Sequence, residues 1–345
     1  MHRLNSVASK RNISSRTERR TIATLAVRAF IALAISAGLA SVVHAQSYPS
    51  RLVRFVVPFP AGGGVDLVIR AAAQELSSKW GTPVIVENRV GAGGTVGTEA
   101  VFRAAPDGYT LLATINQTIT TAPYLFKSLQ YDPSKFTPIT LMVQSDNFVL
   151  AHPAVPANSL RELVDLVKEQ PKKWNYGSFG RGSQPQLLFE YLNSKEGLDL
   201  LHIPYNGISP LLIAMITGEV SFTTGSAGVA GEFLRAGKLK ALAIAGKKRS
   251  PQFPDVPTTE EAGFGYLQSS IWYAVFAPPG TPAETVDKVG GDLRAILRRP
   301  DFIEHQIASK GLEAVASTPA ELATVVEKEA ASIKTMIDAA SVLAE

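Results

Sequence analysis

The stretch that decides the fold is FVVPFPAGGGVD, residues 55–66. An apolar segment leads into three consecutive glycines, and apolar residues then recur at helical spacing from Val65 to about Lys79. Glycine reaches backbone dihedrals that are closed to other residues and lets a ligand approach without meeting a Cβ atom. The helix that follows begins with unpaired N–H groups at the positive end of its dipole. Strand, glycine turn and helix N-terminus together predict an anion-binding site.

The same stretch is also compatible with a tight strand–helix connection that binds nothing, and it does not match the nucleotide-binding motifs. It lacks the G-x-x-x-x-G-K-[ST] pattern of a nucleoside-triphosphate loop and the G-x-G-x-x-G pattern of a dinucleotide site. Asp66, two residues past the glycines, would repel a pyrophosphate, whereas its place in the first helical turn suits the helix dipole. We therefore expect the ligand to be a carboxylate on a small solute.

Glycine-rich turns recur between a predicted strand and a predicted helix at residues 91–95 and 179–183. The first strands of the chain alternate with helices, which indicates a parallel sheet with helices on its faces. These strands are expected at 52–59, 83–87 and 109–114. Apolar segments further on predict a second sheet, with strands at 174–178, 200–204, 220–224 and 241–245.

The last third of the chain is predicted to return to the first sheet. It begins with a strand at 270–277 and ends in helices that need a sheet to pack on. TPAE occurs at both 281–284 and 318–321, where Thr is expected at the N-cap, Pro at the first helical position and Glu capping back. We expect the chain to leave the first domain near Val149–His152 and to return near Ser270–Ala274, which makes a hinge with a cleft between two α/β lobes.

Further candidate binding residues follow predicted strands, where open α/β sheets bind ligands. They are Thr114, Asn116, Gly180, Ser183, Tyr205 and Asn206. Thr114 ends the strand at 109–114 and Asn116 follows it. Gly180 and Ser183 lie in the glycine-rich turn at 179–183, and Tyr205 and Asn206 follow the strand at 200–204. Each is equally compatible with an ordinary loop, turn or helix cap.

No residue pattern predicts an enzyme, a metal site or a cofactor. The chain has no cysteine and five histidines, of which His152, His202 and His305 lie far apart in the sequence. The nucleophile motif G-x-S-x-G is missing from the sequence, and the carboxylates are scattered singly. We therefore predict no catalytic residue, no metal ligand and no cofactor.

The charge distribution argues against nucleic acid as a partner. The pI is about 9.1, but residues 1–45 hold seven of the 34 Lys and Arg residues and one of the 30 acidic residues, so the remaining chain has a net charge of −2. The basic leader precedes an apolar segment at about 29–43 and a small-residue site, which predicts a signal peptide cleaved near Ala45 and a periplasmic protein. A membrane anchor is disfavoured by the short apolar run, and a mitochondrial transit peptide is a second alternative.

Taken together, the motifs resemble the Bug-type (Bordetella uptake gene) periplasmic receptors of the tripartite tricarboxylate transporters. They cover essentially the whole mature chain in order. The matching segments are 48–51 (YPSR), 56–66 (VVPFPAGGGVD), 86–94 (VENRVGAGG), 105–112 (APDGYTLL), 131–133 (YDP), 202–205 (HIPY), 236–243 (AGKLKALA), 254–258 (PDVPT) and 277–282 (APPGTP).

The resemblance implies a monomeric two-lobe receptor with a type II-like periplasmic binding protein fold, each lobe a mixed sheet flanked by helices. Lobe 1 would comprise 46–150 and 271–345, and lobe 2 would comprise 151–270. A small carboxylate would bind in the cleft between them and be delivered to membrane transporter subunits. The residues implied for the first lobe are Phe59, Ala61, Gly62, Gly63, Gly64 and Asp66, with Thr114 and Asn116; those implied for the second lobe are Gly180, Ser183, Tyr205 and Asn206.

Two positions depart from the family pattern, and both lie in the second lobe. The family usually has Lys or Arg where this chain has Asn206, and Asp where it has Ser221. A specific substrate is therefore not carried over. A receptor that signals to a membrane sensor and an exported enzyme acting on a small organic acid remain alternatives.

Overall fold

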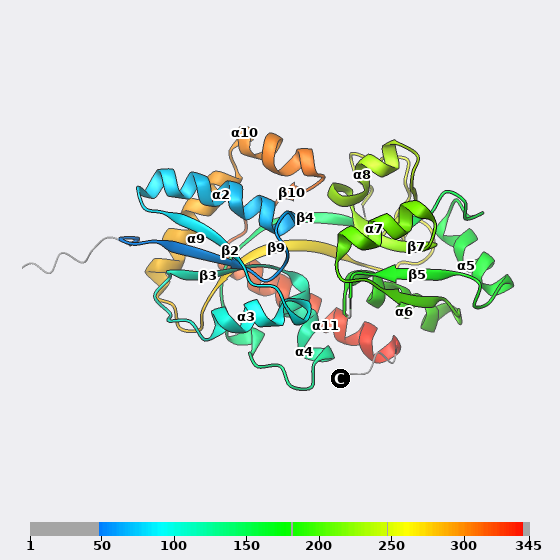
Figure 1. Ribbon diagram of the computed structural model, residues 1–345, viewed down its shortest axis with the longest axis horizontal. Coiled ribbons are helices and arrows are strands. Elements are labelled where there is room, and N and C mark those ends of the chain that lie inside the picture. The colour runs from blue at the N-terminus through cyan, green and yellow to red at the C-terminus, as the bar shows by residue number, and fades with distance from the viewer. Residues whose placement is uncertain (1–47, 181, 247, 341–345) are drawn as a thin grey trace, which may run out of the picture. The chain divides into compact units, whose positions relative to one another are not determined.

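In the residues that the computed structural model describes, 48–180, 182–246 and 248–340, ten strands form one hydrogen-bonded sheet (Figure 1). The signal peptide predicted at 1–45 and its cleavage near Ala45 lie outside the described residues. The strand order is β2-β1-β3-β9-β4-β7-β5-β6, and β8 and β10 pair with β4.

The first half of the sheet is built on three parallel strands, as the alternation of strands and helices predicts. β1 (Val53–Val57) lies between β2 (Val84–Asn88) and β3 (Thr110–Ile115), and both pairings are parallel. β9 (Ser270–Ala277) joins antiparallel to β3. We call β2, β1, β3, β9 and the part of β4 that pairs with β9 the first sheet half.

The strand β4 (Thr137–Ala151) is common to both parts of the sheet. It pairs with β9 up to Asp146, which lies opposite Ser270, and with β7 from Asn147, which lies opposite Ser226. The second sheet half comprises the later part of β4 and the strands β5 (Asn175–Ser178), β6 (Leu201–Pro204), β7 (Phe222–Ser226) and β8 (Lys240–Ile244). The chain therefore passes from one half to the other between adjacent residues of one strand.

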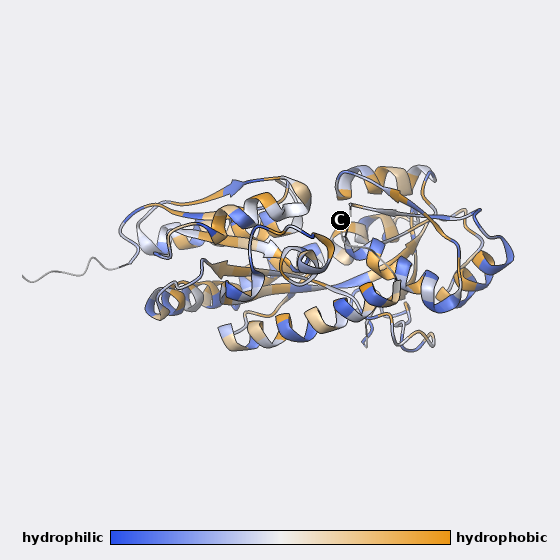
Figure 2. Cartoon of the chain, turned by 90° about the horizontal axis from the view of Figure 1, so that it is seen from below, coloured by the Kyte–Doolittle hydropathy of each residue, from blue (hydrophilic) through white to orange (hydrophobic). Residues whose placement is uncertain are grey.

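Helices cover both faces of each sheet half (Figure 1). In the first half, α2 (Gly64–Trp80) and α9 (Ala283–Leu297) lie on one face, and α3 (Thr95–Phe102) and part of α11 (Pro319–Ala340) lie on the other. In the second half, α5 (Leu160–Glu169) and α6 (Gln184–Glu196) lie opposite α7 (Ile208–Thr217) and α8 (Ala227–Arg235). The hydropathy colouring follows this layering, with apolar residues toward the sheet and polar residues outside (Figure 2).

Short elements connect the layers. They are η1 (Ala92–Gly94), η2 (Gln117–Thr121), α4 (Ala122–Leu125), η3 (Pro133–Lys135), α10 (Pro300–Phe302), η4 (Ile303–Ile307), η5 (Ala308–Lys310) and β10 (Glu313–Ala314).

The two TPAE copies cap their helices differently. Thr318 and Glu321 form the expected reciprocal cap, because the Glu321 amide donates to Thr318 Oγ1 and the Thr318 amide donates to the Glu321 carboxylate. The prediction that Thr281 is an N-cap is wrong. Pro282 holds that position without a side-chain cap, and the Thr281 hydroxyl donates to the Pro278 carbonyl at 2.9 Å.

The last helix, α11, contributes to the cores of both sheet halves. Leu322 belongs to the cluster under α3, whereas Ile333 and Met336 belong to the cluster of α5 and α6. These residues recur at helical spacing on one face of α11. Residues 271–345 were all expected in the first lobe, so the contacts of the second half of α11 with the second cluster are a feature that sequence reasoning did not predict.

Candidate functional site

The first glycine turn connects the end of β1 to the start of α2. Gly62 has a φ of +82°, which a residue with a Cβ rarely adopts, and Gly63 is the helix N-cap with extended dihedrals. Because the N-cap is a glycine, it has no side chain with which to cap this helix. Ala61 and Gly62 are exposed. The turn therefore presents backbone groups, and the amides of the first helical turn lack intrahelical acceptors.

The buried Asp66 carboxylate holds this turn. It accepts the Gly62 amide at 2.9 Å, the Arg70 Nε at 2.9 Å and the Asn88 side-chain amide at 2.9 Å. The Asn88 amide also donates to the Phe59 carbonyl, at 2.9 Å, so that both ends of the turn are tied to one cluster. Asp66 is 1% exposed and points at the turn's own backbone.

Asp66 is ionised under ordinary conditions. Burial alone would raise the pKa of Asp66, but the hydrogen bonds from Arg70, the Gly62 amide and Asn88, with the charge of Arg70, outweigh burial and hold the pKa below its usual value. The negative charge is compensated inside the cluster by Arg70. The turn can therefore offer its remaining amides to an external anion.

Gly64 and Gly94 allow close packing around the turn. A Cβ at Gly64 would lie 2.2 Å from the Tyr273 hydroxyl. A Cβ at Gly94 would lie 2.7 Å from the Thr118 methyl and 3.0 Å from the Phe59 ring. The second glycine turn, at 91–94, thus packs against the first, and Phe59 forms part of the contact.

Thr114 and Asn116 lie at the end of β3 with internal hydrogen-bond partners. The Thr114 hydroxyl bonds that of Thr118 at 2.7 Å, and both residues are fully buried. The Asn116 amide donates to the Ser270 carbonyl at 3.0 Å and to the Glu329 carboxylate at 2.7 Å. These hydrogen bonds of Asn116 are thus made with β9 and α11.

The third glycine turn lies between β5 and α6. The Gly180 carbonyl accepts the Ser183 hydroxyl at 2.6 Å, and the Gly180 amide donates to the Ser178 hydroxyl at 3.3 Å. Ser178 also bonds His202 Nε2 at 2.7 Å. Burial lowers the pKa of His202, although the nearby Glu190 opposes this shift, so the imidazole is favoured in its neutral form. Sequence reasoning missed this Ser–His pair, since the two residues lie on different strands.

Tyr205 joins the same turn, whereas Asn206 lies on the surface. The Tyr205 amide donates to the Ser178 carbonyl at 2.8 Å. The Tyr205 hydroxyl donates to Glu219 at 3.0 Å, and burial together with this carboxylate raises the pKa of Tyr205 to about 12. Asn206 is exposed. Gly180, Ser183 and Tyr205 therefore form one group around Ser178.

The Ser270 carbonyl connects this group to the first sheet half. It accepts from Asn116 and, at 3.0 Å, from the side-chain amide of Gln184, which directly follows Ser183. Gln184 was missed by sequence reasoning. Its position at the first residue of a helix after a glycine turn is the one signal that could have indicated it.

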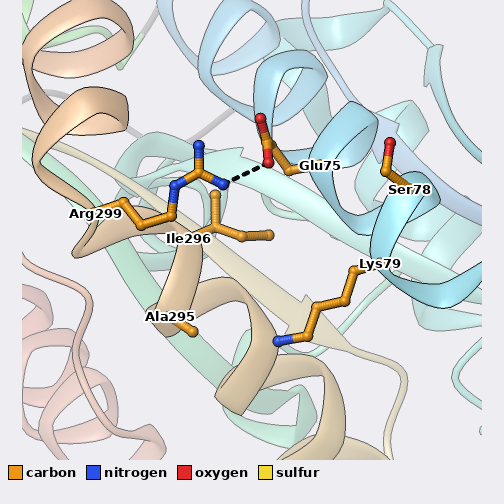
Figure 3. Close-up of a pocket in the computed structure, with 6 residues that line it drawn as sticks. All are labelled: Glu75, Ser78, Lys79, Ala295, Ile296 and Arg299. Atoms are coloured by element: carbon orange, nitrogen blue, oxygen red, sulfur yellow. Dashed lines mark hydrogen bonds and ion pairs between the residues drawn. The ribbon is translucent and has the colours of Figure 1, made fainter.

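A surface pocket of about 370 Å³ lies elsewhere, between α2 and α9 (Figure 3). Its charged residues are paired, with Arg299 on Glu75 at 2.6 Å and Lys79 on Asp292 at 2.8 Å. Glu75 and Lys79 belong to the C-terminal part of α2, on the order of 20 Å of helix rise away from the glycine turn. The pocket is therefore not part of the candidate site.

Two properties of the described residues bear on other functions. No group of three or more His, Cys, Asp or Glu residues among them could hold a metal ion. None of their helices combines the length and the apolar character that crossing a membrane requires.

Comparison with known proteins identifies the family. The profile described as tripartite tricarboxylate transporter family receptor matches residues 68–342. The chain belongs to this receptor family. Members are solute-binding receptors rather than enzymes, and the predicted resemblance to Bug-type receptors is confirmed.

A relative from Bordetella pertussis, described as a UPF0065 protein, is 40% identical over 265 residues, which are 77% of this chain and 82% of that protein. The solved structure of the periplasmic binding protein BugD is 35% identical with a TM-score of 0.77, covering 86% of this chain and 100% of that one. The predicted α/β fold of a periplasmic binding protein is therefore confirmed.

Two similar structures contain dicarboxylates. MatC from Rhodopseudomonas palustris, with bound malate, is 34% identical with a TM-score of 0.77 and covers 84% of this chain and 100% of that one. An R. palustris protein with adipate is 28% identical with a TM-score of 0.80, covering 86% of this chain and 100% of that one.

Proposed function

We propose that this receptor binds a small carboxylated organic compound between two lobes in the periplasm and delivers it to a membrane tripartite tricarboxylate transporter. Residues 46–150 with 271–345 form the first lobe and 151–270 the second, and cleavage near Ala45 releases the mature monomer. The malate and adipate bound to two similar proteins support the ligand class.

The observation that carries the proposal is the first glycine turn. Asp66 fixes its backbone by accepting the Gly62 amide, and the helix behind it begins at a glycine N-cap that has no side chain to cap it. A ligand carboxylate accepting these amides gains hydrogen bonds to a charged group, each about 1.5–3 kcal/mol, and the helix terminus adds up to about 2 kcal/mol. A few such contacts reach the roughly 8 kcal/mol of micromolar binding.

The second group, Gly180, Ser183 and Tyr205, faces the ligand from the other lobe in this proposal. Its hydroxyl and backbone groups are neutral, and the exposed Asn206 replaces the cation usual in the family. Asn206 and Ser221 lie in this lobe, so part of the discrimination between carboxylates resides there.

The test is a thermal-shift screen of the purified protein against di- and tricarboxylates, aromatic acids and amino acids, followed by calorimetry. Methyl esters of each hit are the control, because an ester lacks the anion. We expect micromolar affinity for at least one carboxylate and none for its ester. If no carboxylate binds, or if esters bind equally well, the proposal is wrong.

Delivery to a transporter is tested separately from binding. Cells that make the membrane subunits should take up the labelled ligand only when the receptor is supplied. A receptor that binds its ligand, supports no uptake and co-purifies with a membrane sensor would assign the chain to signalling instead.

A further inference from the structure

The dipeptide Ser269-Ser270, at the start of β9, is the centre of a hydrogen-bond network that includes the buried side chains of Asn116 and Asn147. The Ser270 carbonyl accepts from Asn116 and from Gln184, each at 3.0 Å. The Ser269 hydroxyl donates to Gln184 Oε1 and accepts from Asn147 Nδ2, which lies 3.1 Å away. The network joins β3, β4, β9 and α6.

The hydrogen bonds fix the orientation of each amide side chain. A carbonyl oxygen only accepts, so the groups that face Ser270 O are the amide nitrogens of Asn116 and Gln184. Gln184 therefore turns its oxygen toward Ser269 and takes the single hydroxyl proton of that residue. Since Ser269 then has only lone pairs for Asn147, the Asn147 nitrogen must face it.

With the amide groups oriented in this way, the side-chain oxygens of two asparagines have no hydrogen-bond donor among the described residues. Among the described residues, neither Asn116 Oδ1 nor Asn147 Oδ1 has a hydrogen-bond partner. Asn116 is 1% exposed and Asn147 is 0% exposed. Buried polar atoms in folded proteins are nearly always paired, so two unpaired acceptors attached to one network require a specific explanation.

The position of the two oxygens relates them to the proposed binding site. Asn147 is the first residue of β4 that pairs with β7, so it lies where the chain passes between the two sheet halves. Asn116 directly follows β3, and Gln184 follows Ser183 of the third glycine turn. Glu329 is an ionisable group in contact with the network, and its ionised form disfavours a second anion beside Asn116.

We propose that Asn147, together with Asn116, determines specificity by accepting hydrogen bonds from a hydroxyl or ammonium group carried by the bound carboxylate. The inference rests on the proposed function and narrows it to hydroxy- or amino-substituted acids. A solute reaches the two buried oxygens when the lobes separate, and the same network re-forms around it on closure.

The experiment compares ligands that differ only in the donor. Calorimetry with succinate, malate and aspartate, and with glutarate, 2-hydroxyglutarate and glutamate, keeps the carbon chain and both carboxylates constant within each set. We expect the best substituted acid to bind at least about tenfold more tightly than its unsubstituted parent, because the parent leaves the acceptors unpaired. The malate and aspartate arms distinguish a hydroxyl from an ammonium donor.

The variant that tests Asn147 is Asn147→Leu, which keeps the approximate size and removes the acceptor. The preference for the substituted acid should fall to less than about threefold. Asn175→Leu is the matched control. The Asn175 side chain likewise makes two hydrogen bonds, donating to the Glu219 carbonyl and accepting from the Ser221 amide, but it lies outside the network. This control should retain the full preference.

The outcomes separate this inference from the proposed function. Equal affinity for parent and substituted acids in the unmodified protein overturns the inference while leaving carboxylate binding intact. An undiminished preference in Asn147→Leu overturns the role of this residue. If Asn147→Leu fails to fold, the ligand comparison in the unmodified protein still decides the donor requirement. No binding of any carboxylate is the different result that overturns the function itself.

Discussion

The Asp66 carboxylate accepts the backbone amide of Gly62 at 2.9 Å, four residues before it in the chain. A carboxylate in the first turn of α2 thus holds the preceding glycine turn against the N-terminus of the same helix. Arg70 and Asn88 complete the pairing of both carboxylate oxygens. The family motif GGGVD therefore has a structural reason, because the Asp determines the conformation that the glycines permit.

Asp66→Ala should destabilise the protein by about 2–4 kcal/mol, because it leaves the Gly62 amide and Asn88 without their acceptor in a buried setting. Since the pKa of Asp66 is lowered, its stabilisation is present at neutral pH and is lost as the pH falls through the folded-state pKa. Urea unfolding of both proteins at neutral and acidic pH measures the effect.

The control is Asp338→Ala, which removes an exposed ion pair to Lys334. It should cost less than about 1 kcal/mol. Equal losses for the two substitutions would mean that the Asp66 cluster adds nothing beyond a surface charge pair.

Gly63→Val should abolish ligand binding and leave the protein folded. Gly63 has a φ of −72°, and an added Cβ would meet the Pro60 carbonyl at 3.4 Å, which is ordinary contact. A branched side chain there would cover the amides at the start of α2. We expect calorimetry to show at least about a hundredfold loss of affinity, because two hydrogen bonds to a charged group are lost. The melting temperature of the variant should stay within a few degrees of that of the unmodified protein. Gly265→Val, at an exposed loop glycine, is the control that should retain affinity.

The strand–glycine–helix units could be predicted from the sequence because each is local. The helix expected from Val65 to about Lys79 is observed as α2 over Gly64–Trp80. By contrast, α8 was not predicted, since Gly228 and Gly231 weaken its helical pattern. The reason for Gly228 is tertiary, because the Lys310 backbone packs directly against it.

The hydrogen-bond network around Ser269-Ser270 could not be predicted, because its partners are distant in sequence. Sequence reasoning proposed Asn116 as a binding residue from its place after a strand and did not single out Asn147; it predicted for neither the contact with Ser269-Ser270. The glycine turns of the candidate site could therefore be predicted, because each is formed by a short local stretch of backbone. The hydrogen bonds of side chains whose partners lie more than 100 residues away could not.

Glu329 should make stability depend on pH near neutrality. It lies in the apolar face of α11 and accepts from Asn116 and from the Trp272 indole. Burial raises its pKa to about 7 despite these hydrogen bonds and one from Thr120. A carboxyl with a raised folded-state pKa contributes stability at low pH that is lost as the pH rises from about 4.5 to about 7.

Glu329→Gln should remove this dependence, since the amide does not titrate. The difference in unfolding free energy between variant and parent should change by about 2.5 kcal/mol between pH 5 and pH 8, and the variant should gain stability relative to the parent as the pH rises. His202 titrates in both proteins, so its contribution cancels in the difference. Parallel pH profiles from urea unfolding would show that Glu329 does not titrate in this range.

Gly228→Ala should destabilise the contact between α8 and η5, whereas Gly231→Ala in the same helix should not. A Cβ at Gly228 would lie 1.9 Å from the Lys310 carbonyl oxygen, a backbone atom that can move only with its segment. At Gly231 the nearest atoms lie 3.7 Å away, at the ends of the Arg235 and Phe253 side chains.

We expect a loss of about 3 kcal/mol for Gly228→Ala and a gain of up to about 1 kcal/mol for Gly231→Ala, since alanine favours the helix. Because α8 belongs to the second sheet half and η5 connects to the first through β10 and β4, the clash must separate these segments or strain the helix. Urea unfolding measures both changes, and equal stability of the two variants would contradict the close backbone contact.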